Sequence, residues 1–257
     1  MDRITSTANP VVKRLRSLRD TKAREEYGEF LVEGEVMIRE ALKCGLKPSD
    51  ALMEEEGHLL AALESAGARV HIASRSALEA VCDTKTPQGS CAAFSLPRRI
   101  RVPENARLLV ALDGVQDPGN LGTIWRTADA SGFDALLLGE GCADPYSPKV
   151  QRAAMGSGFR VPLVESSLPE ALQSLQKEGF RVVVSALDGD ALYAHPFTDP
   201  SEKLALVIGN EAHGVSRTVQ SLADIRLKIP MRGGAESLNA AVASGILMYE
   251  LTRNTLS

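Results

Sequence analysis

The chain has 257 residues, of which 44% are hydrophobic and 24% are charged, and its formal net charge is −4. A chain of this length can bury a sizeable core, and two domains are the default expectation, with one larger domain as the alternative. The longest apolar runs are too short to span a bilayer, and the first ten residues lack the pattern of a secretory signal.

The four cysteines and four histidines are scattered along the chain. No C-x-x-C spacing occurs, which disfavours a zinc ribbon and a disulfide framework. Isolated histidines are more often structural than metal ligands. We therefore expect reduced thiols, a cytoplasmic protein and no bound metal.

Basic residues cluster near the amino terminus despite the negative net charge. Asn9 and Pro10 are typical of an N-cap and a first helical residue, and apolar residues supply one buried face of the helix. Basic side chains occupy the other faces, and the candidates for RNA contact are Lys13, Arg14, Arg16 and Arg19. A solvated helix face is the alternative interpretation.

Short apolar runs then alternate with helical patterns up to residue 97. The sequence predicts strands at 30–32, 51–53, 70–72 and 91–94, and helices at 36–42, 59–66 and 77–81. This alternation is typical of a small α/β domain over residues 1–97. The following stretch is basic and bounded by prolines, with Arg98, Arg99 and Arg101, and predicts a linker at 98–104.

The second predicted domain covers residues 105–257. Nearly continuous apolar runs at 108–112, 135–138, 182–185 and 204–208 are typical of parallel strands that are covered on both faces. Helices are expected between them, at 121–131, 149–155 and 171–177. The sequence therefore predicts a parallel-sheet α/β domain.

The last part of this domain joins a strand, a glycine loop and an apolar helix. Pro230 ends a strand predicted from Arg226, and Gly233 and Gly234 allow backbone to approach a ligand closely. Ser237 is predicted to cap a helix that is apolar nearly all round. Such a helix is either a core element or half of a subunit interface.

Three nucleotide or hydrolase signatures are missing from the sequence. The first βα junction of the second domain, 112–120, lacks the G-x-G-x-x-G spacing, which disfavours a dinucleotide-dependent oxidoreductase. No P-loop motif and no G-x-S-x-G elbow occur. Polar residues close to glycines instead mark three loops near the strand ends, where open parallel sheets bind ligands.

Three motifs mark these loops: NLGTIWRTAD at 120–129, LVIGNEAHG at 206–214, and IPM at 229–231 with ESLNAA at 236–241. Together they resemble the SpoU (TrmH-type) RNA ribose 2′-O-methyltransferases of the SPOUT superfamily. They occur in the order of the family and with similar spacing. The segment 4–41 also resembles the ribosomal-protein-like α/β domain with which many members bind RNA.

The resemblance implies a fold, a cofactor and an assembly. It implies a parallel-sheet catalytic domain with a carboxyl-terminal trefoil knot, S-adenosylmethionine as methyl donor, and a homodimer with the active site near the subunit interface. By the same resemblance, backbone at Gly209, Ile229 and Leu238 holds the cofactor, with Ile208 and Met231 beside it. The implied catalytic residues are Arg126, Asn120, Glu211, Ser237 and Asn239.

The chemistry suggests a role for each of these side chains. A guanidinium holds its proton too firmly to be a good general base, so we expect Arg126 to grip the target phosphate and polarise the 2′-hydroxyl. Glu211 would orient its neighbours or accept from the hydroxyl network, and Asn120 and Asn239 would supply amide hydrogen bonds. Ser237 would cap the last helix while facing the substrate, and Asn120 has the alternative role of a simple N-cap.

The resemblance therefore predicts an RNA ribose 2′-O-methyltransferase whose expected target is ribosomal RNA, with transfer RNA as the alternative target. The alternatives are a non-catalytic RNA-binding or ribosome-assembly protein that retains the cofactor pocket, and a nucleotide-dependent oxidoreductase.

Overall fold

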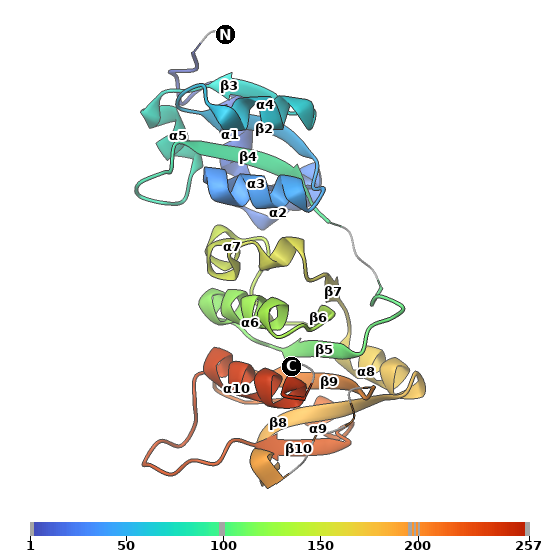
Figure 1. Ribbon diagram of the computed structural model, residues 1–257. Helices are drawn as coiled ribbons and strands as arrows, with labels where there is room; N and C mark the ends of the chain where they lie inside the picture. The colour runs from blue at the N-terminus through green and yellow to red at the C-terminus, as the bar shows by residue number, and fades with distance from the viewer. Residues whose placement is uncertain (1–2, 98–100, 195–196, 198, 200, 255–257) are drawn as a thin grey trace. The chain divides into compact units, whose positions relative to one another are not determined.

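The computed structural model describes residues 3–97, 101–194, 197, 199 and 201–254 (Figure 1). Contacts divide the chain into two compact units. The amino-terminal unit is Met1–Arg98 with Tyr146–Phe159, and the carboxyl-terminal unit is Arg99–Pro145 with Arg160–Ser257. Residues 98–100 of the predicted linker lie outside the described residues. None of the helices in the described ranges is long and apolar enough to cross a membrane.

The amino-terminal unit is an α/β fold around a four-stranded mixed sheet of order β1-β4-β2-β3. Strands β2 and β3 are parallel, whereas β4 runs antiparallel to β1 and to β2. The predicted strands and helices are all present, and α2 was not predicted. The elements are α1 (Pro10–Ser17), α2 (Thr21–Tyr27), β1 (Glu29–Glu33), α3 (Glu35–Lys43), β2 (Pro48–Met53), α4 (His58–Ser65), β3 (Arg69–Ile72), α5 (Arg75–Val81) and β4 (Ser90–Ser95).

Alternate side chains of this sheet fill two separate cores. In β1, Phe30 and Val32 pack with residues of α3 and α4, whereas Leu31 packs with residues of α1 and α5. Successive side chains of a strand point to opposite faces, so a wholly apolar strand requires helices on both sides. Both faces are covered here, which explains the unbroken apolar runs in the sequence.

A segment from the middle of the chain completes the amino-terminal unit. It contains α7 (Pro148–Ala154) and the 3-10 turn η1 (Ser157–Phe159). The ring of Phe30 lies 5.1 Å from that of Tyr146 and 6.2 Å from that of Phe159, between centroids. Arg152 forms an ion pair with Asp83 at 2.9 Å. Periodicity assigns this segment to the second predicted domain, because packing onto a distant part of the chain leaves no local signal.

The carboxyl-terminal unit contains a six-stranded sheet of order β10-β8-β9-β5-β6-β7, and all pairings in its described strands are parallel. The predicted parallel-sheet α/β fold is confirmed. The elements are β5 (Leu108–Asp113), α6 (Pro118–Ala130), β6 (Ala135–Leu138), β7 (Leu163–Glu165), α8 (Leu168–Lys177), β8 (Phe180–Ala191), η2 (Leu192–Ala194), β9 (Lys203–Gly209), α9 (Arg217–Gln220), β10 (Ile225–Lys228) and α10 (Ala240–Thr252).

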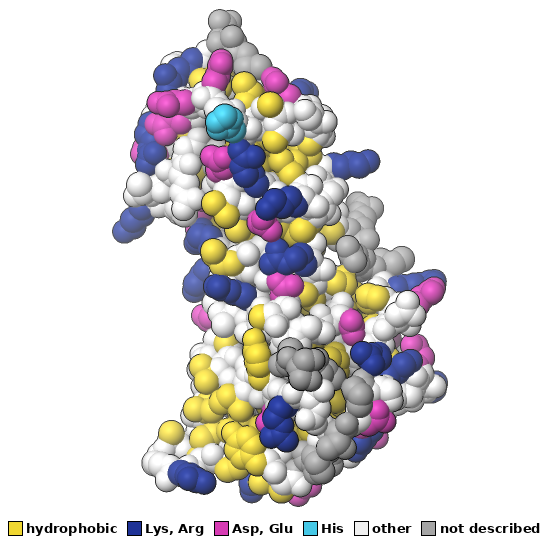
Figure 2. Space-filling model, viewed as in Figure 1, with side chains coloured by type: hydrophobic (Ala, Val, Ile, Leu, Met, Phe, Trp, Pro, Cys, Tyr) yellow, Lys and Arg dark blue, Asp and Glu magenta, His cyan; other side chains and the backbone are white. Residues whose placement is uncertain are grey.

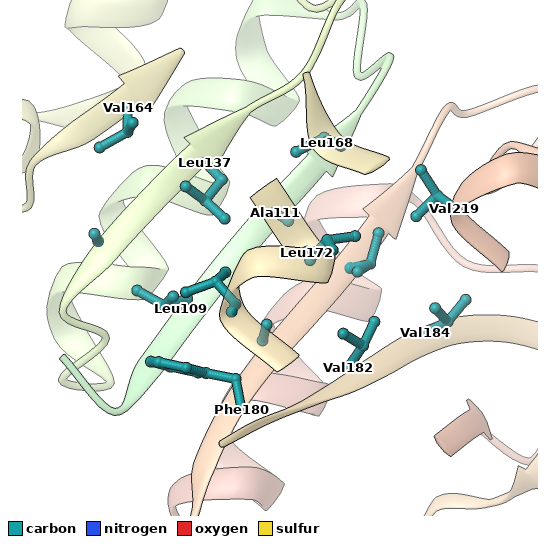
Figure 3. Packing of buried hydrophobic residues seen from close by; sticks show 14 of the residues in the cluster. Leu109, Ala111, Leu137, Val164, Leu168, Leu172, Phe180, Val182, Val184 and Val219 are labelled. Carbon is teal, nitrogen blue, oxygen red and sulfur yellow. The ribbon is translucent and has the colours of Figure 1, made fainter. Parts of the chain in front are cut away.

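Helices cover both faces of this sheet. Leu168 and Leu172 of α8 and Val219 of α9 pack on one face, against alternate residues of the central strands (Figure 3). On the other face α10 packs against α6 and β9 (Figure 1). The interior of the unit is therefore mostly apolar, and the buried hydroxyls of Ser131, Ser244 and Thr252 donate to backbone carbonyls of α6 and α10.

The strand order reverses at β5. The chain proceeds outward from β5 through β6 to β7, and then returns to the other side of β5 through β8 and β9. At the carboxyl edge Asp113 of β5 lies opposite Gly209 of β9. A reversal of this kind opens a crevice at the carboxyl ends of the strands, and ligands of open α/β sheets bind there.

Two helix starts differ from the prediction. Helix α6 begins at Pro118 and is capped by Asp117, so Asn120 lies inside the helix and is not its N-cap. Asp is as good an N-cap as Asn, and Pro favours the first helical position. Helix α10 begins at Ala240 with Asn239 as its N-cap, so Ser237 does not cap it and Leu238 precedes it.

Candidate active site

Three loops at the carboxyl edge of the large sheet are joined by a directional chain of hydrogen bonds. Asn239 uses its Oδ1 to accept from the backbone N–H groups of Ala241 and Val242, which leaves its Nδ2 free to donate. That Nδ2 donates to Oδ1 of Asn120 at 2.9 Å, and Nδ2 of Asn120 donates to Oε1 of Glu211 at 2.9 Å. The helix cap thus fixes the orientation of both amides.

Glu211 is the acceptor at the end of this chain. Besides the Asn120 amide, its carboxylate accepts from the backbone N–H groups of Gln116 and Asp117, each at 3.2 Å. Partial burial raises the pKa of Glu211, but the hydrogen bonds from Asn120 and from backbone N–H groups outweigh it, and the pKa lies below its ordinary value of 4.5. Glu211 is therefore ionised at neutral pH, and its carboxylate holds the loop before α6 through charge-assisted hydrogen bonds.

Replacement of Glu211 by glutamine is expected to lower stability in a pH-dependent way. One donor must lose its partner, because the glutamine side chain has a single acceptor oxygen. Since the folded-state pKa is depressed, the carboxylate contributes its full stability above pH 4.5 and loses it as the pH falls through the folded-state value. Melting temperatures of the two proteins should differ at neutral pH and converge in acid. A difference that is constant with pH would contradict the assignment.

The loop after β9 is closed tightly on itself. Asn210 pairs with Gly214 across the loop, and its side chain accepts from Ala212 and His213 and donates to the carbonyl of Gly114 at 2.7 Å. A Cβ on Gly209 would lie 2.1 Å from the carbonyl carbon of Gly214. The sequence interpretation missed the structural role of Asn210, although an Asn after a glycine is a common signal for such a turn.

The predicted cofactor residues lie along the same edge. Ile208 and Gly209 end β9, and Ile229 follows β10, with β8 between these two strands. Met231 and Leu238 are half-buried in the connection from β10 to α10. The backbone groups of Met231 and Leu238 make no hydrogen bond to other residues that the structure describes. Apolar side chains with available main-chain donors and acceptors fit an adenosyl ligand.

Arg126 and Ser237 remain outside the hydrogen-bonded chain. Both are exposed, and neither makes a hydrogen bond or ion pair to any part of the chain that the structure describes. The neighbouring Trp125 is fully buried and donates through Nε1 to the carbonyl of Val161 at 3.0 Å. This bond anchors α6, so Arg126 projects from a fixed backbone with its five donors available for an anion.

The four candidate RNA contacts of α1 divide into two pairs. Arg14 forms ion pairs with Glu29 and Asp50, and Arg19 donates to the carbonyls of Val81 and Cys82. Lys13 and Arg16 are exposed, and neither makes an ion pair within the described ranges. Within α1, Lys13 and Arg16 are therefore the two candidates whose donors are not engaged by any residue that the structure describes, whereas Arg14 and Arg19 already use theirs inside the fold.

Fold and site together define an α/β protein in which side chains of three sequence motifs meet at the carboxyl edge of a parallel sheet. Two family models match the chain: the SpoU rRNA Methylase family at residues 107–249, and the MRM3-like substrate binding domain at residues 9–92. The chain belongs to the SpoU rRNA methylase family. The resemblance inferred from the three motifs is therefore confirmed.

Individual relatives are similar over the full length. The chain is 40% identical over 251 residues to the 23S rRNA (guanosine(2553)-2'-O)-methyltransferase RlmP of Bacillus subtilis, covering 98% of this chain and 99% of the relative. A crystal structure of an AdoMet-bound rRNA methyltransferase from Sinorhizobium meliloti superposes with a TM-score of 0.91 at 31% identity, over 100% and 99% of the two chains. The SpoU methyltransferase AviRb from Streptomyces viridochromogenes, in complex with AdoMet, gives 0.84 at 29% identity, over 97% and 99%.

Proposed function

We propose that this protein is an S-adenosylmethionine-dependent RNA methyltransferase that methylates a ribose 2′-hydroxyl in ribosomal RNA. The observation that carries the proposal is the chain from Asn239 through Asn120 to Glu211, which joins the three family motifs at the strand-order reversal. The full-length similarity to a 23S rRNA 2′-O-methyltransferase supports ribosomal RNA as the substrate class.

Each residue of the site then has its own task. When bound, S-adenosylmethionine supplies an electrophilic methyl group, and Ile208, Gly209, Ile229, Met231 and Leu238 would hold it. Arg126 grips the target phosphate and polarises the 2′-hydroxyl, whose proton leaves through phosphate or water. Glu211, Asn120 and Asn239 hold the three motif segments in position, and Ser237 faces the substrate. Alignment is the main contribution of the protein, because the electrophile is intrinsically reactive.

The proposal includes the finer features of the family. These are a trefoil knot in the carboxyl-terminal domain, a cytoplasmic location, and no metal. We also retain the division into an RNA substrate domain at 1–97, a linker at 98–104 and a methyltransferase domain at 105–257, from which the segment 146–159 packs with the amino-terminal unit. An experimental structure of the cofactor complex, traced from Gly209 to Asn239, tests the knot, because an unknotted path would contradict it.

A homodimer is proposed through the exposed apolar face of α10. Val242 is 52% exposed and Tyr249 is 48% exposed, and hydrophobic side chains gather over the region of α10 (Figure 2). Replacement of Val242 by glutamate would bury a charge in this contact and is expected to yield a monomer in analytical ultracentrifugation. Glutamate at Leu187, which is 70% exposed and lies outside α10, is the matched control. A Val242 variant that sediments as the wild type would exclude this interface.

Comparative mapping tests the function itself. The 2′-O-methylated positions of total RNA are compared between cells with and without the gene, and binding of S-adenosylmethionine is measured by calorimetry. Loss of one ribosomal position is the expected result. Loss of a transfer RNA position would reassign the substrate, and an unchanged map with no cofactor binding would leave the non-catalytic alternative.

Charge removal on α1 tests the RNA substrate domain. Replacement of Lys13 and Arg16 by alanine is expected to weaken RNA binding and to reduce the slope of log affinity against log salt by about 1 for each phosphate that is no longer bound. Lys177, an exposed lysine of α8, is the matched control. An unchanged salt slope in the double variant would mean that this helix face is merely solvated.

A further inference from the structure

Two tyrosines of the carboxyl-terminal unit, Tyr193 and Tyr249, are exposed, and only Tyr249 belongs to the apolar face of α10. All six phenylalanines and the single tryptophan are buried. Tyr193 of η2 is 66% exposed, and the structure records no hydrogen bond or ring contact for it within the described ranges. Its exposure leaves an apolar ring in water, which costs free energy unless a ligand covers it.

Strand register places Tyr193 next to the predicted cofactor edge. Ala191, the last residue of β8, lies opposite Lys228, the last residue of β10, in a parallel pairing. The chain continues to Ile229 from one strand and to Tyr193 from the other, so both leave the sheet at the same edge. Neighbouring strands lie about 4.8 Å apart, and each residue advances about 3.3 Å, which puts the two backbones within roughly 10 Å.

The backbone beneath Tyr193 is held firmly. Leu192 is fully buried, and the pairing of β8 with β10 shifts register between Arg226 and Leu227. In that irregular stretch a Cβ on Gly189 would lie 2.5 Å from the carbonyl carbon of Arg226, and the side chain of Arg226 pairs with Asp188 at 2.7 Å. An exposed ring on a packed backbone is preorganised for contact with a planar ligand.

Two cationic side chains belong to the segment that leaves the sheet beside η2. Lys228 and Arg232 are exposed and make no ion pair with any residue that the structure describes, while Asp188, which pairs with Arg226, and Asp190 are adverse charges on the adjoining strand end. Aromatic rings that stack on bases, combined with cations that contact phosphates, are how proteins bind unpaired RNA. We propose that Tyr193 stacks on a nucleobase of the RNA substrate next to the methylated ribose. This inference rests on the proposed function and deepens it.

The test uses the full-length protein with ribosomal RNA extracted from cells that lack the gene as methyl acceptor. Tyr193→Ala is expected to raise the KM for this RNA by roughly 5- to 150-fold, the loss typical of one stacked base, with kcat within about twofold. Tyr193→Phe keeps the ring and should restore most of the affinity. Leu187→Ala removes a similarly exposed apolar side chain from β8 and should leave the KM unchanged.

Binding of S-adenosylmethionine and the oligomeric state are measured for each variant. Wild-type values for both, with a raised KM in Tyr193→Ala alone, support the stacking role. A wild-type KM in Tyr193→Ala overturns it, as does a KM defect that phenylalanine fails to correct. Loss of cofactor binding or dissociation into monomers also overturns it, in favour of a pocket wall or a subunit contact. A wild-type protein that methylates none of this RNA removes the proposed function, and this inference with it.

Discussion

Replacement of Arg126 by alanine is expected to lower kcat for methyl transfer by about 10²- to 10³-fold, the loss typical of one donor that stabilises developing charge. Binding of S-adenosylmethionine should remain intact, because Arg126 is exposed and contributes to no contact that holds the described fold. Single-turnover methyl transfer and calorimetry separate the two effects. Arg217, an exposed arginine of α9 in the same unit, is the control, and its alanine variant should keep wild-type activity.

The lysine variant distinguishes a positioning role from a general base. Lysine retains the charge but lacks the planar fork that binds a phosphate through two parallel hydrogen bonds, so Arg126→Lys should recover only part of the lost rate. Lysine also loses a proton more easily than arginine. If a general base were required, the activity of the Arg126→Lys variant would rise at high pH to the wild-type level or above. That outcome would contradict the phosphate-gripping role.

Replacement of Gly209 by alanine should damage both fold and cofactor site. The added Cβ would lie 2.1 Å from the carbonyl carbon of Gly214 and 2.2 Å from the backbone nitrogen of Val215, so backbone must move. Overpacking of this severity costs about 3 kcal/mol, which corresponds to a fall of roughly 6–12 °C in melting temperature. Displacement of the 209–215 loop should also weaken binding of S-adenosylmethionine, measured by calorimetry.

Gly233 supplies the matched control for that substitution. It lies in the connection to α10, and no heavy atom would come within 4 Å of an added Cβ. Gly233→Ala should change the free energy of unfolding by less than about 0.5 kcal/mol. A Gly209→Ala protein with the wild-type melting temperature and cofactor affinity would show that the loop is not held as tightly as its geometry implies.

Local patterns predicted most of the fold because its elements are regular and well marked. Asn9 with Pro10 gives the start of α1, and unbroken apolar runs give β5, β6 and β9, since parallel strands are covered on both faces. Short elements were missed, including α2, β7 and α9. The three residues of β7 and the four of α9 offer too little periodicity for a sequence pattern.

The candidate site was predicted as a set of residues, but its connections were not. Capping was assigned to Asn120 and Ser237, whereas Asp117 and Asn239 perform it, because several good capping residues stand close together in each loop. The link from Asn239 to Asn120 joins positions 119 residues apart, and no local pattern encodes such a contact. The division of the α1 cations into free and engaged side chains likewise depends on Glu29, Asp50 and the carbonyls at the end of α5.

The rings of Tyr146 and Phe159 have a consequence for any attempt to cut this protein in two. Both pack against Phe30, although they are joined through the chain to β6 and β7. A fragment that begins at residue 105 would therefore carry Tyr146 and Phe159 without Phe30, their packing partner. The fragment that ends before residue 105 would lose part of its apolar interior. A protease that cleaves once near residue 100 would leave two pieces that this segment still holds together. Separation into independent modules requires removal of 146–159 as well.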